Sequence, residues 1–491
     1  MELERLSAVE LGRRIAAGEL KCSEVVRYFL DRSIERNAAL NALIEIDEEA
    51  LNAAEEIDRR SSRESRRSPL EGVPIVIKDI LCMEGKRTTC ASRMLENFTA
   101  PYTATAVKRL LDGGVLPIGR ANMDEFAMGG STETSYFGVT RNPWDLSRTP
   151  GGSSGGSAAA LAAGMAPLAV GTDTGGSVRQ PSAYCGVVGL KPTYGRISRY
   201  GLVAFASSLD QVGPMAHYVE DVAALLQLMA GPDGRDSTSL PAAVDDYLGA
   251  LGKPLDGLRV GVISEHVEHP DVAPEVRQAV QRAITHLTDL GAALEQVHLA
   301  LTRYAVPTYY LVAPSEASSN LSRYDGVHYG YRDRPAEGVE SPLVSMMSRT
   351  RSHGFGDEVK RRVMLGTFAL SAGYYDAYYK KALKVRRMIA EEMRRAFERV
   401  DVLVGPVAPT PAFSLGENAD DPVRMYLQDQ FTVAANLAGI PALAVPAGFN
   451  DQGLPLAVQL QGAPLSEATL LNVAYHLQQN RFFVPRVAEW K

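Results

Sequence analysis

The first sixty residues alternate apolar and polar positions with a helical period. A capping box formed by Ser7 and Glu10 predicts the start of a first helix. Two further helices are predicted over residues 24–36 and 48–60. The expected buried face of the second helix consists of Val25, Val26, Phe29, Leu30 and Ile34. These helices form an N-terminal segment, residues 1–65, that precedes a longer core over residues 66–480.

Short apolar runs of strand length dominate the core. The first, residues 73–77, predicts a buried strand that ends at Lys78. Further strands are predicted at 115–118, 168–170, 258–263, 292–298, 402–404, 442–445 and 456–460, and helices at 104–111, 157–165, 274–290 and 358–399. This mixed order predicts a single α/β domain, 1–491, in which helices cover both faces of one central mixed β-sheet. We find no internal repeat and no low-complexity linker that would divide the chain.

Composition narrows the class of protein. The chain has 51 basic and 58 acidic residues, a net charge of −7, so a nucleic-acid partner would need another subunit to hold most of its backbone. The basic loop at 59–68 is interpreted as a solvated surface loop, with RNA contact as the alternative. The N-terminus lacks an apolar signal core, and the longest nearly apolar run, 158–170, is too short to span a bilayer. Four cysteines without a CxxC pair predict no metal site and a reduced, cytoplasmic setting.

Two glycine- and serine-rich loops are candidates for chemistry. The first, residues 151–157, has three possible interpretations: a flexible linker, a phosphate-binding loop or a loop that carries a nucleophile. No Gly-Lys-Ser/Thr sequence closes the run, which argues against phosphate binding. It matches a GxSxG pattern around Ser154, but residues 147–150 do not form the strand that this motif requires. The second, residues 171–177, follows an apolar strand and presents Ser177 on a glycine turn, where backbone N–H groups can face an oxyanion.

Lys78 is the candidate base for either serine. None of the eight histidines lies between residues 71 and 200, so a histidine base, the other alternative, would have to fold in from a distant part of the chain. Burial at the end of a strand would lower the pKa of Lys78 and favour its neutral amine, with Asp79 on the opposite face. The alternative is a lysine that extends to solvent.

The order of these features resembles the amidase signature family. The match includes Lys78, the Gly-Gly-Ser-Ser-Gly-Gly run, Gly-Thr-Asp before the second loop, and the stretches 185–186 and 189–193. The resemblance implies an amidase fold in which Ser177 is the nucleophile, Ser153, after a cis peptide, is the bridging serine and Lys78 is the base. It assigns the oxyanion hole to the N–H groups of Thr174, Gly175, Gly176 and Ser177.

Within that family, the stretches 122–133, 314–321, 354–362 and 425–429 resemble the glutaminase subunits of tRNA-dependent amidotransferases. The resemblance implies that free glutamine is bound through its carboxylate by Arg362, with Arg361 as the rival, and through its ammonium by Asp429. The remaining substrate contacts that it implies are Met128, Gly129, Gly130 and Tyr310.

The implied reaction releases ammonia from glutamine and needs no cofactor in this chain. A partner, the B subunit of the complex, would use the ammonia with ATP and Mg²⁺ on a misacylated tRNA, Glu-tRNA(Gln) or Asp-tRNA(Asn). A small third partner, the C subunit, would wrap this chain and make the assembly a heterotrimer. The chain has no Walker motif, which agrees with ATP being used elsewhere. The alternatives are a stand-alone amidase acting on another small amide and a non-enzymatic protein with a decayed site, against which the intact Lys78, Ser153 and Ser177 count.

Overall fold

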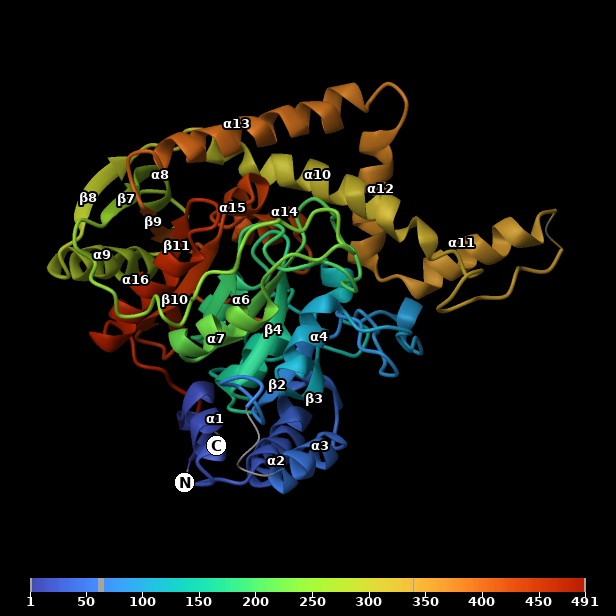
Figure 1. Ribbon diagram of the computed structural model, residues 1–491. Coiled ribbons are helices and arrows are strands. Elements are labelled where there is room, and N and C mark those ends of the chain that lie inside the picture. The colour runs from blue at the N-terminus through green and yellow to red at the C-terminus, as the bar shows by residue number, and fades with distance from the viewer. Residues whose placement is uncertain (1, 61–65, 339, 490–491) are drawn as a thin grey trace.

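One mixed β-sheet organises the molecule. The computed structural model describes residues 2–60, 66–338 and 340–489. In this part, eleven strands pair in the order β1-β3-β2-β4-β6-β5-β10-β11-β9-β7-β8 (Figure 1). Their bounds are β1 Leu43–Ile46, β2 Pro74–Lys78, β3 Leu116–Ala121, β4 Leu168–Asp173, β5 Val188–Lys191, β6 Gln211–Ala216, β7 Arg259–Ile263, β8 Ala293–Val297, β9 Val402–Pro406, β10 Ala442–Phe449 and β11 Pro455–Gly462. The eight strands expected from the sequence are therefore confirmed, whereas β1, β5 and β6 were not predicted.

Helices cover both faces of the sheet, which confirms the predicted α/β class. Strand β2 runs parallel to β3 and β4, whereas β10 runs antiparallel to β5 and β11. On one face of β11, Gln459 accepts a hydrogen bond from Arg179 of helix α6 (Arg179–Cys185). On the other face, the backbone of Gly462 packs against Leu470 of helix α16 (Glu467–Gln479).

The N-terminal helices follow the predicted pattern with one exception. Helix α1 (Ala8–Ala16) begins at Ser7, whose hydroxyl accepts from the Glu10 N–H at 3.1 Å. Helices α2 (Cys22–Leu40) and α3 (Ala50–Arg59) follow. The assignment of Ile34 to the buried face is wrong, because its side chain is 51% exposed. The buried stripe passes instead through Ser33, whose hydroxyl donates to the Met165 carbonyl at 3.1 Å.

The later helices flank the sheet and extend beyond it. Their bounds are α4 Thr105–Asp112, α5 Gly155–Ala162, α7 Val219–Met229, α8 Ser264–Val267, α9 Pro274–Asp289, α10 Ala305–Asn320, α11 Pro342–Gly354, α12 Asp357–Leu370, α13 Lys381–Ala396, α14 Pro422–Tyr426 and α15 Val433–Ala438. The predicted helix at 358–399 is two helices, α12 and α13, separated by a break at 371–375, and a π-helical turn, Asp376–Lys380, leads directly into α13. Of the predicted basic loop, residues 61–65 lie outside the described part.

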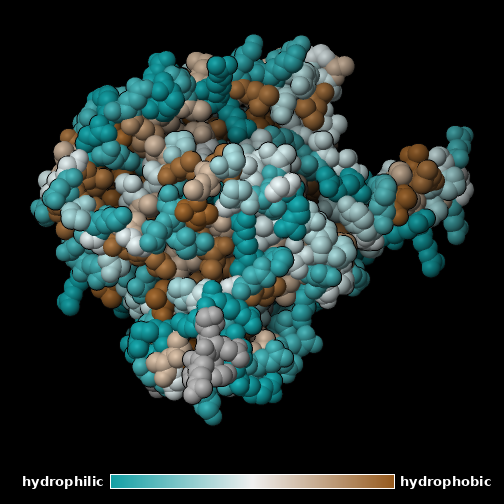
Figure 2. All heavy atoms as spheres, viewed as in Figure 1, coloured by the Kyte–Doolittle hydropathy of each residue, from teal (hydrophilic) through white to brown (hydrophobic). Residues whose placement is uncertain are grey.

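Helices α11, α12 and α13 carry much of the exposed apolar surface. Helix α11 projects from the body of the molecule (Figure 1), and apolar side chains gather near its tip, where Leu343 and Val344 are exposed (Figure 2). Further exposed apolar residues on α12 and the break after it are Met364, Leu365, Phe368, Tyr374 and Tyr375. The four cysteines are free and buried. Among the described residues, no helix has the length and apolar character needed to cross a membrane.

Candidate active site

Lys78 lies at the end of β2, between β3 and β4, and is completely buried. Its Nζ lies 2.7 Å from Ser153 Oγ, 2.8 Å from Ser154 Oγ and 2.9 Å from Thr172 Oγ1. The alternative of a lysine that extends to solvent is therefore wrong. Asp79 faces away from this cluster, as predicted, and pairs with Arg120 at 3.0 Å.

Burial tunes Lys78 for base chemistry. Removal from water lowers the pKa of its ammonium to about 7, although the carboxylates of Asp124, Asp173 and Asp210 oppose this shift. A substantial fraction of the side chain is therefore the neutral amine at neutral pH, the state in which lysine can accept a proton.

Ser153 follows a cis peptide bond with Gly152, as the resemblance implies. Glycine is required before it, because a Cβ at Gly152 would lie 2.0 Å from the carboxylate of Asp124. That carboxylate accepts hydrogen bonds from Thr132 N and Thr134 Oγ1, both at 2.9 Å. Asp124 is thus a structural anchor of the bridging serine, a role that the sequence reasoning missed although the residue lies in the 122–133 stretch.

Ser177 stands on the turn that follows β4. Its carbonyl accepts from Ser154 N at 3.1 Å, which holds the two glycine-rich loops side by side. Its hydroxyl makes no hydrogen bond to any described residue. Gly176 has φ of +138°, and a Cβ there would lie 2.4 Å from Thr432 Oγ1. A side chain at this position would therefore be strained and would also displace the turn.

One of the four predicted oxyanion donors already has a hydrogen-bond acceptor in the structure. The N–H of Gly176 already donates to Asp173 Oδ1 at 2.9 Å, because the carboxylate lies inside the turn. The N–H groups of Thr174, Gly175 and Ser177 have no acceptor among the described residues. In this structure these three, and not Gly176, remain available to a developing negative charge.

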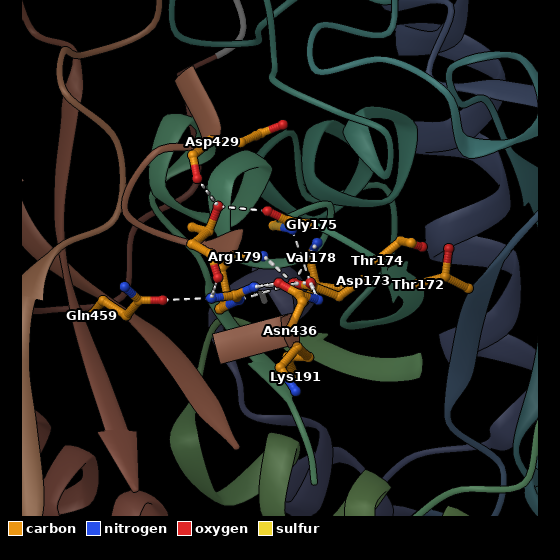
Figure 3. A network of polar contacts seen from close by, with 12 residues as sticks. Thr172, Asp173, Thr174, Gly175, Val178, Arg179, Lys191, Asp429, Asn436 and Gln459 are labelled. Atoms are coloured by element: carbon orange, nitrogen blue, oxygen red, sulfur yellow. Dashed lines mark hydrogen bonds and ion pairs between the residues drawn. The ribbon is translucent and has the colours of Figure 1, made fainter. Parts of the chain in front are cut away.

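A buried ion pair supports the turn from below (Figure 3). Arg179 Nη2 lies 3.0 Å from Asp173 Oδ1, and neither side chain is exposed. The guanidinium also donates to Asn436 Oδ1 and Gln459 Oε1, each at 2.6 Å. Burial alone would raise the pKa of Asp173, but the adjacent Arg179 charge and hydrogen bonds hold it well below its usual range. Asp173 therefore stays ionised and accepts the hydrogen bond from the N–H of Gly176.

We expect Arg179→Ala to destabilise the fold strongly. Removing one partner leaves the Asp173 charge buried without compensation, a change that costs about 3–5 kcal/mol. The free energy of unfolding, measured by urea denaturation, is expected to fall by that amount. Arg394→Ala is the control, because Arg394 lies in an exposed ion pair with Glu391. This variant should leave the free energy of unfolding nearly unchanged. Equal stability of the two variants would contradict this reading of the network.

Arg362, on α12, is buried among aromatic rings. Its side chain is 3% exposed, and its guanidinium carbon lies 5.2 Å from the ring centre of Tyr310 and 5.3 Å from that of Tyr426. Its Nε donates to Glu358 at 2.8 Å, whereas its two terminal nitrogens donate to no described residue. Arg361 is exposed and pairs with the outer oxygen of Glu358. Of the two adjacent arginines, only Arg362 has a buried guanidinium with donors to spare.

Asp429 lies between the aromatic rings and the catalytic turn. Tyr310 Oη donates to Asp429 Oδ2 at 3.4 Å, and Thr432, which contacts the Asp429 carbonyl at 3.0 Å, donates to the Gly175 carbonyl at 2.6 Å. Burial raises the pKa of Asp429 to about 7, against the attraction of Arg362. The predicted cation and anion for an amino acid are thus close to one another and linked to the turn that carries Ser177.

The 128–130 segment joins the same site through Gln180. This side chain donates to the Gly130 carbonyl at 3.0 Å and accepts from Gly152 N at 2.9 Å. Met128, the first residue of this segment, is buried. All eight histidines lie in the described part, and none hydrogen-bonds to Lys78, Ser153 or Ser177. In the described part of the chain, the hydrogen-bond partners of Lys78, Ser153 and Ser177 therefore include no imidazole.

Known proteins match the chain over nearly its whole length. The model of the family described as Amidase matches residues 24–471. The chain is 55% identical to the A subunit of glutamyl-tRNA(Gln) amidotransferase from Carboxydothermus hydrogenoformans, covering 98% of this chain and 99% of the relative. The crystal structure of the protein of the same name from Thermotoga maritima is 40% identical, with a TM-score of 0.82 and 99% of each chain covered.

A peptide amidase from Stenotrophomonas maltophilia has the same fold at lower identity. It is 30% identical, with a TM-score of 0.83 and 99% of each chain covered. The family model and the relatives together confirm the resemblance found in the sequence. The chain belongs to the amidase signature family.

Proposed function

We propose that the chain is the glutamine-hydrolysing subunit of an amidotransferase that acts on misacylated tRNA. The observation that carries the proposal is the buried contact of Lys78 with Ser153 beside the Ser177 turn. The same site holds Arg362, whose two terminal nitrogens donate to no described residue while its Nε donates to Glu358. The names of the relatives that match the chain from end to end support the assignment to an amidotransferase.

Ser177 is proposed as the nucleophile. Its oxygen attacks the side-chain amide carbon of glutamine, while its proton passes to Ser153 and the Ser153 proton passes to neutral Lys78. The N–H groups of Thr174, Gly175 and Ser177 would stabilise the oxyanion. Return of the proton to the leaving nitrogen breaks the C–N bond and releases ammonia. A glutamyl ester remains on Ser177, and water activated by the same relay hydrolyses it to glutamate.

Free glutamine would bind by its charged end. The terminal nitrogens of Arg362 suit two parallel hydrogen bonds to the α-carboxylate, and Asp429 suits the α-ammonium. The hydrogen bond from Tyr310 Oη would hold the Asp429 carboxylate in place for this contact. The backbone of Gly129 and Gly130, which follow Met128, would border the amide end of the substrate, next to Gly152 and Ser153.

The ammonia would be consumed in a partner. We propose that Glu-tRNA(Gln) or Asp-tRNA(Asn) is activated with ATP and Mg²⁺ in the B subunit, and that a heterotrimer is completed by the small C subunit. The net negative charge of the chain supports the view that another protein of the complex holds the tRNA. The exposed apolar residues of α11 and α12 support the existence of protein contacts, since such surfaces often mark interfaces.

Substitution of Arg362 tests the choice of substrate. We expect Arg362→Ala and Asp429→Ala each to lower kcat/KM for glutamine by about 30-fold or more, because removal of one partner from a buried charge contact costs about 2–5 kcal/mol. Turnover of a neutral aliphatic amide should change little, since that amide has no charged end to bind. The measurement is ammonia release from both substrates by wild type and variants.

Arg361→Ala is the matched control, because it removes the same charge one residue away at an exposed position. It should keep the wild-type preference for glutamine. A stand-alone amidase would instead turn over the neutral amide well and show no selective loss in Arg362→Ala. A selective loss in Arg361→Ala alone would move the carboxylate contact to that residue.

A further inference from the structure

The amine of Lys78 has three hydroxyl neighbours but only one lone pair when neutral. Ser153, Ser154 and Thr172 all lie within 2.9 Å of Nζ. A neutral amine donates two hydrogens and accepts one. To act as the base for Ser153, Lys78 must direct its lone pair at that hydroxyl and place both of its hydrogens on the other two neighbours.

Ser154 can only accept from Lys78. Its hydroxyl hydrogen is donated to the Thr172 carbonyl at 3.2 Å, and one of its lone pairs accepts from Thr172 N, also at 3.2 Å. One lone pair remains, and it faces Nζ. Ser154 therefore fixes one N–H of the amine. Its full burial and saturated bonding also argue against the alternative that Ser154 is the nucleophile.

Thr172 provides the acceptor for the second hydrogen. Its Oγ1 lies 2.9 Å from Nζ, whereas its carbonyl oxygen, also within reach, is farther away at 3.5 Å and already accepts from Ser154. Its Oγ1 makes one hydrogen bond in the described structure, to Lys78 Nζ. It stands near the end of β4, next to the turn, and is almost fully buried. We propose that Thr172 is a positioning residue whose hydroxyl accepts an N–H of neutral Lys78 and, together with Ser154, aims the lone pair at Ser153. This inference rests on the proposed role of Lys78 as the base.

Loss of this acceptor should affect the two states of Lys78 unequally. The ammonium form donates to Thr172 through a charge-assisted bond, which is stronger than the bond from the neutral amine. Removing the hydroxyl therefore disfavours the charged form more and lowers the pKa of Lys78. The other groups that act on Nζ are the carboxylates of Asp124, Asp173 and Asp210 and the thiol of Cys90, and none of them hydrogen-bonds to it. Their positions do not depend on the Thr172 hydroxyl.

The test uses Thr172→Val, which keeps the branched shape, and Thr172→Ser, which restores the hydroxyl. A phosphonyl fluoride serves as the probe of nucleophilicity. Attack by Ser177 forms a P–O bond and expels fluoride, while the serine proton passes through Ser153 to Lys78. We expect Thr172→Val to react about 10- to 100-fold more slowly on the high-pH plateau, because the base is misdirected. The acid limb of its rate profile should move to lower pH, and Thr172→Ser should recover both properties.

Ser157→Ala is the matched control, since Ser157 is a buried hydroxyl that bonds to the Val170 carbonyl of β4 and does not contact Lys78. It should leave rate and pH profile unchanged. A faster Thr172→Val would overturn the inference, because it would mean that Thr172 donates to the lone pair and competes with Ser153. An unchanged rate would also overturn it, because the hydroxyl would then have no part in orienting the amine. A slower rate without movement of the acid limb would also overturn it. If the phosphonyl fluoride labels Ser177 of the wild type but the wild type does not hydrolyse glutamine, the proposed substrate is wrong and the inference about Thr172 still holds.

Discussion

Ser177→Ala is expected to abolish glutamine hydrolysis. Its kcat should fall by a factor of about 10⁶, the loss found when the nucleophile is removed from a set of catalytic residues that act as a unit. The reason is that no other hydroxyl can replace it. Ser153 and Ser154 are fully buried and already contact Lys78, whereas the Ser177 hydroxyl has no partner among the described residues and lies on the turn that exposes three N–H groups. Without it, the glutamyl ester cannot form.

The measurement is glutamate formation from glutamine by the variant in its complex. Ammonia supplied directly should still support amidation of the tRNA, because the partner's chemistry does not use Ser177. The melting temperature should match that of wild type, since the deleted hydroxyl bonds to no described residue. Retention of glutamine hydrolysis in a correctly folded variant would refute the assignment and return Ser154 to consideration.

The parts of the site that lie near one another in sequence were predictable. An apolar run of five residues indicates a buried strand. Whether the lysine at its end stays inside or extends to solvent depended on the position of β2 between β3 and β4. The glycine turn after β4 was visible for the same reason, because the apolar run before it requires a strand and the glycines require a turn. The relation between Lys78, Ser153 and Ser177 came from a family resemblance, since spacing alone does not bring these segments together.

The parts that depend on tertiary packing were not predictable. Ile34 belongs to the apolar pattern of α2, yet the helix buries Ser33 because a carbonyl at Met165 can satisfy its hydroxyl. Arg361 and Arg362 are equivalent in sequence, and only the packing of Tyr310 and Tyr426 around one of them separates the two. The sequence does not show that the N–H of Gly176 donates to the Asp173 carboxylate, because this contact forms only in the folded turn.

Lys78→Met is expected to reduce turnover by about 10²–10⁴ or more, the range that a positioned general base contributes. Methionine keeps the apolar stem of the side chain in its buried slot and removes only the amine. Lys78→Arg should be as inactive, because a guanidinium keeps its proton and offers no lone pair. His266→Ala is the control for a histidine-based mechanism, since His266 packs near the site against Phe431 and should not be needed. An inactive His266→Ala beside an active Lys78→Met would replace the scheme.

The pH dependence of wild type gives an independent check on Lys78. Burial lowers its pKa to about 7, and only the neutral amine accepts a proton, so kcat/KM should rise with pH through about 7 and level off above. The neutral aliphatic amide isolates this effect, because its binding does not involve Asp429. With glutamine the acid limb should be steeper, since burial raises the pKa of Asp429 to about 7 and the carboxylate must also ionise to hold the ammonium. Equal slopes for the two substrates would remove Asp429 from recognition, and a flat profile with the neutral amide between about pH 5.5 and 8.5 would remove Lys78 as the titrating base.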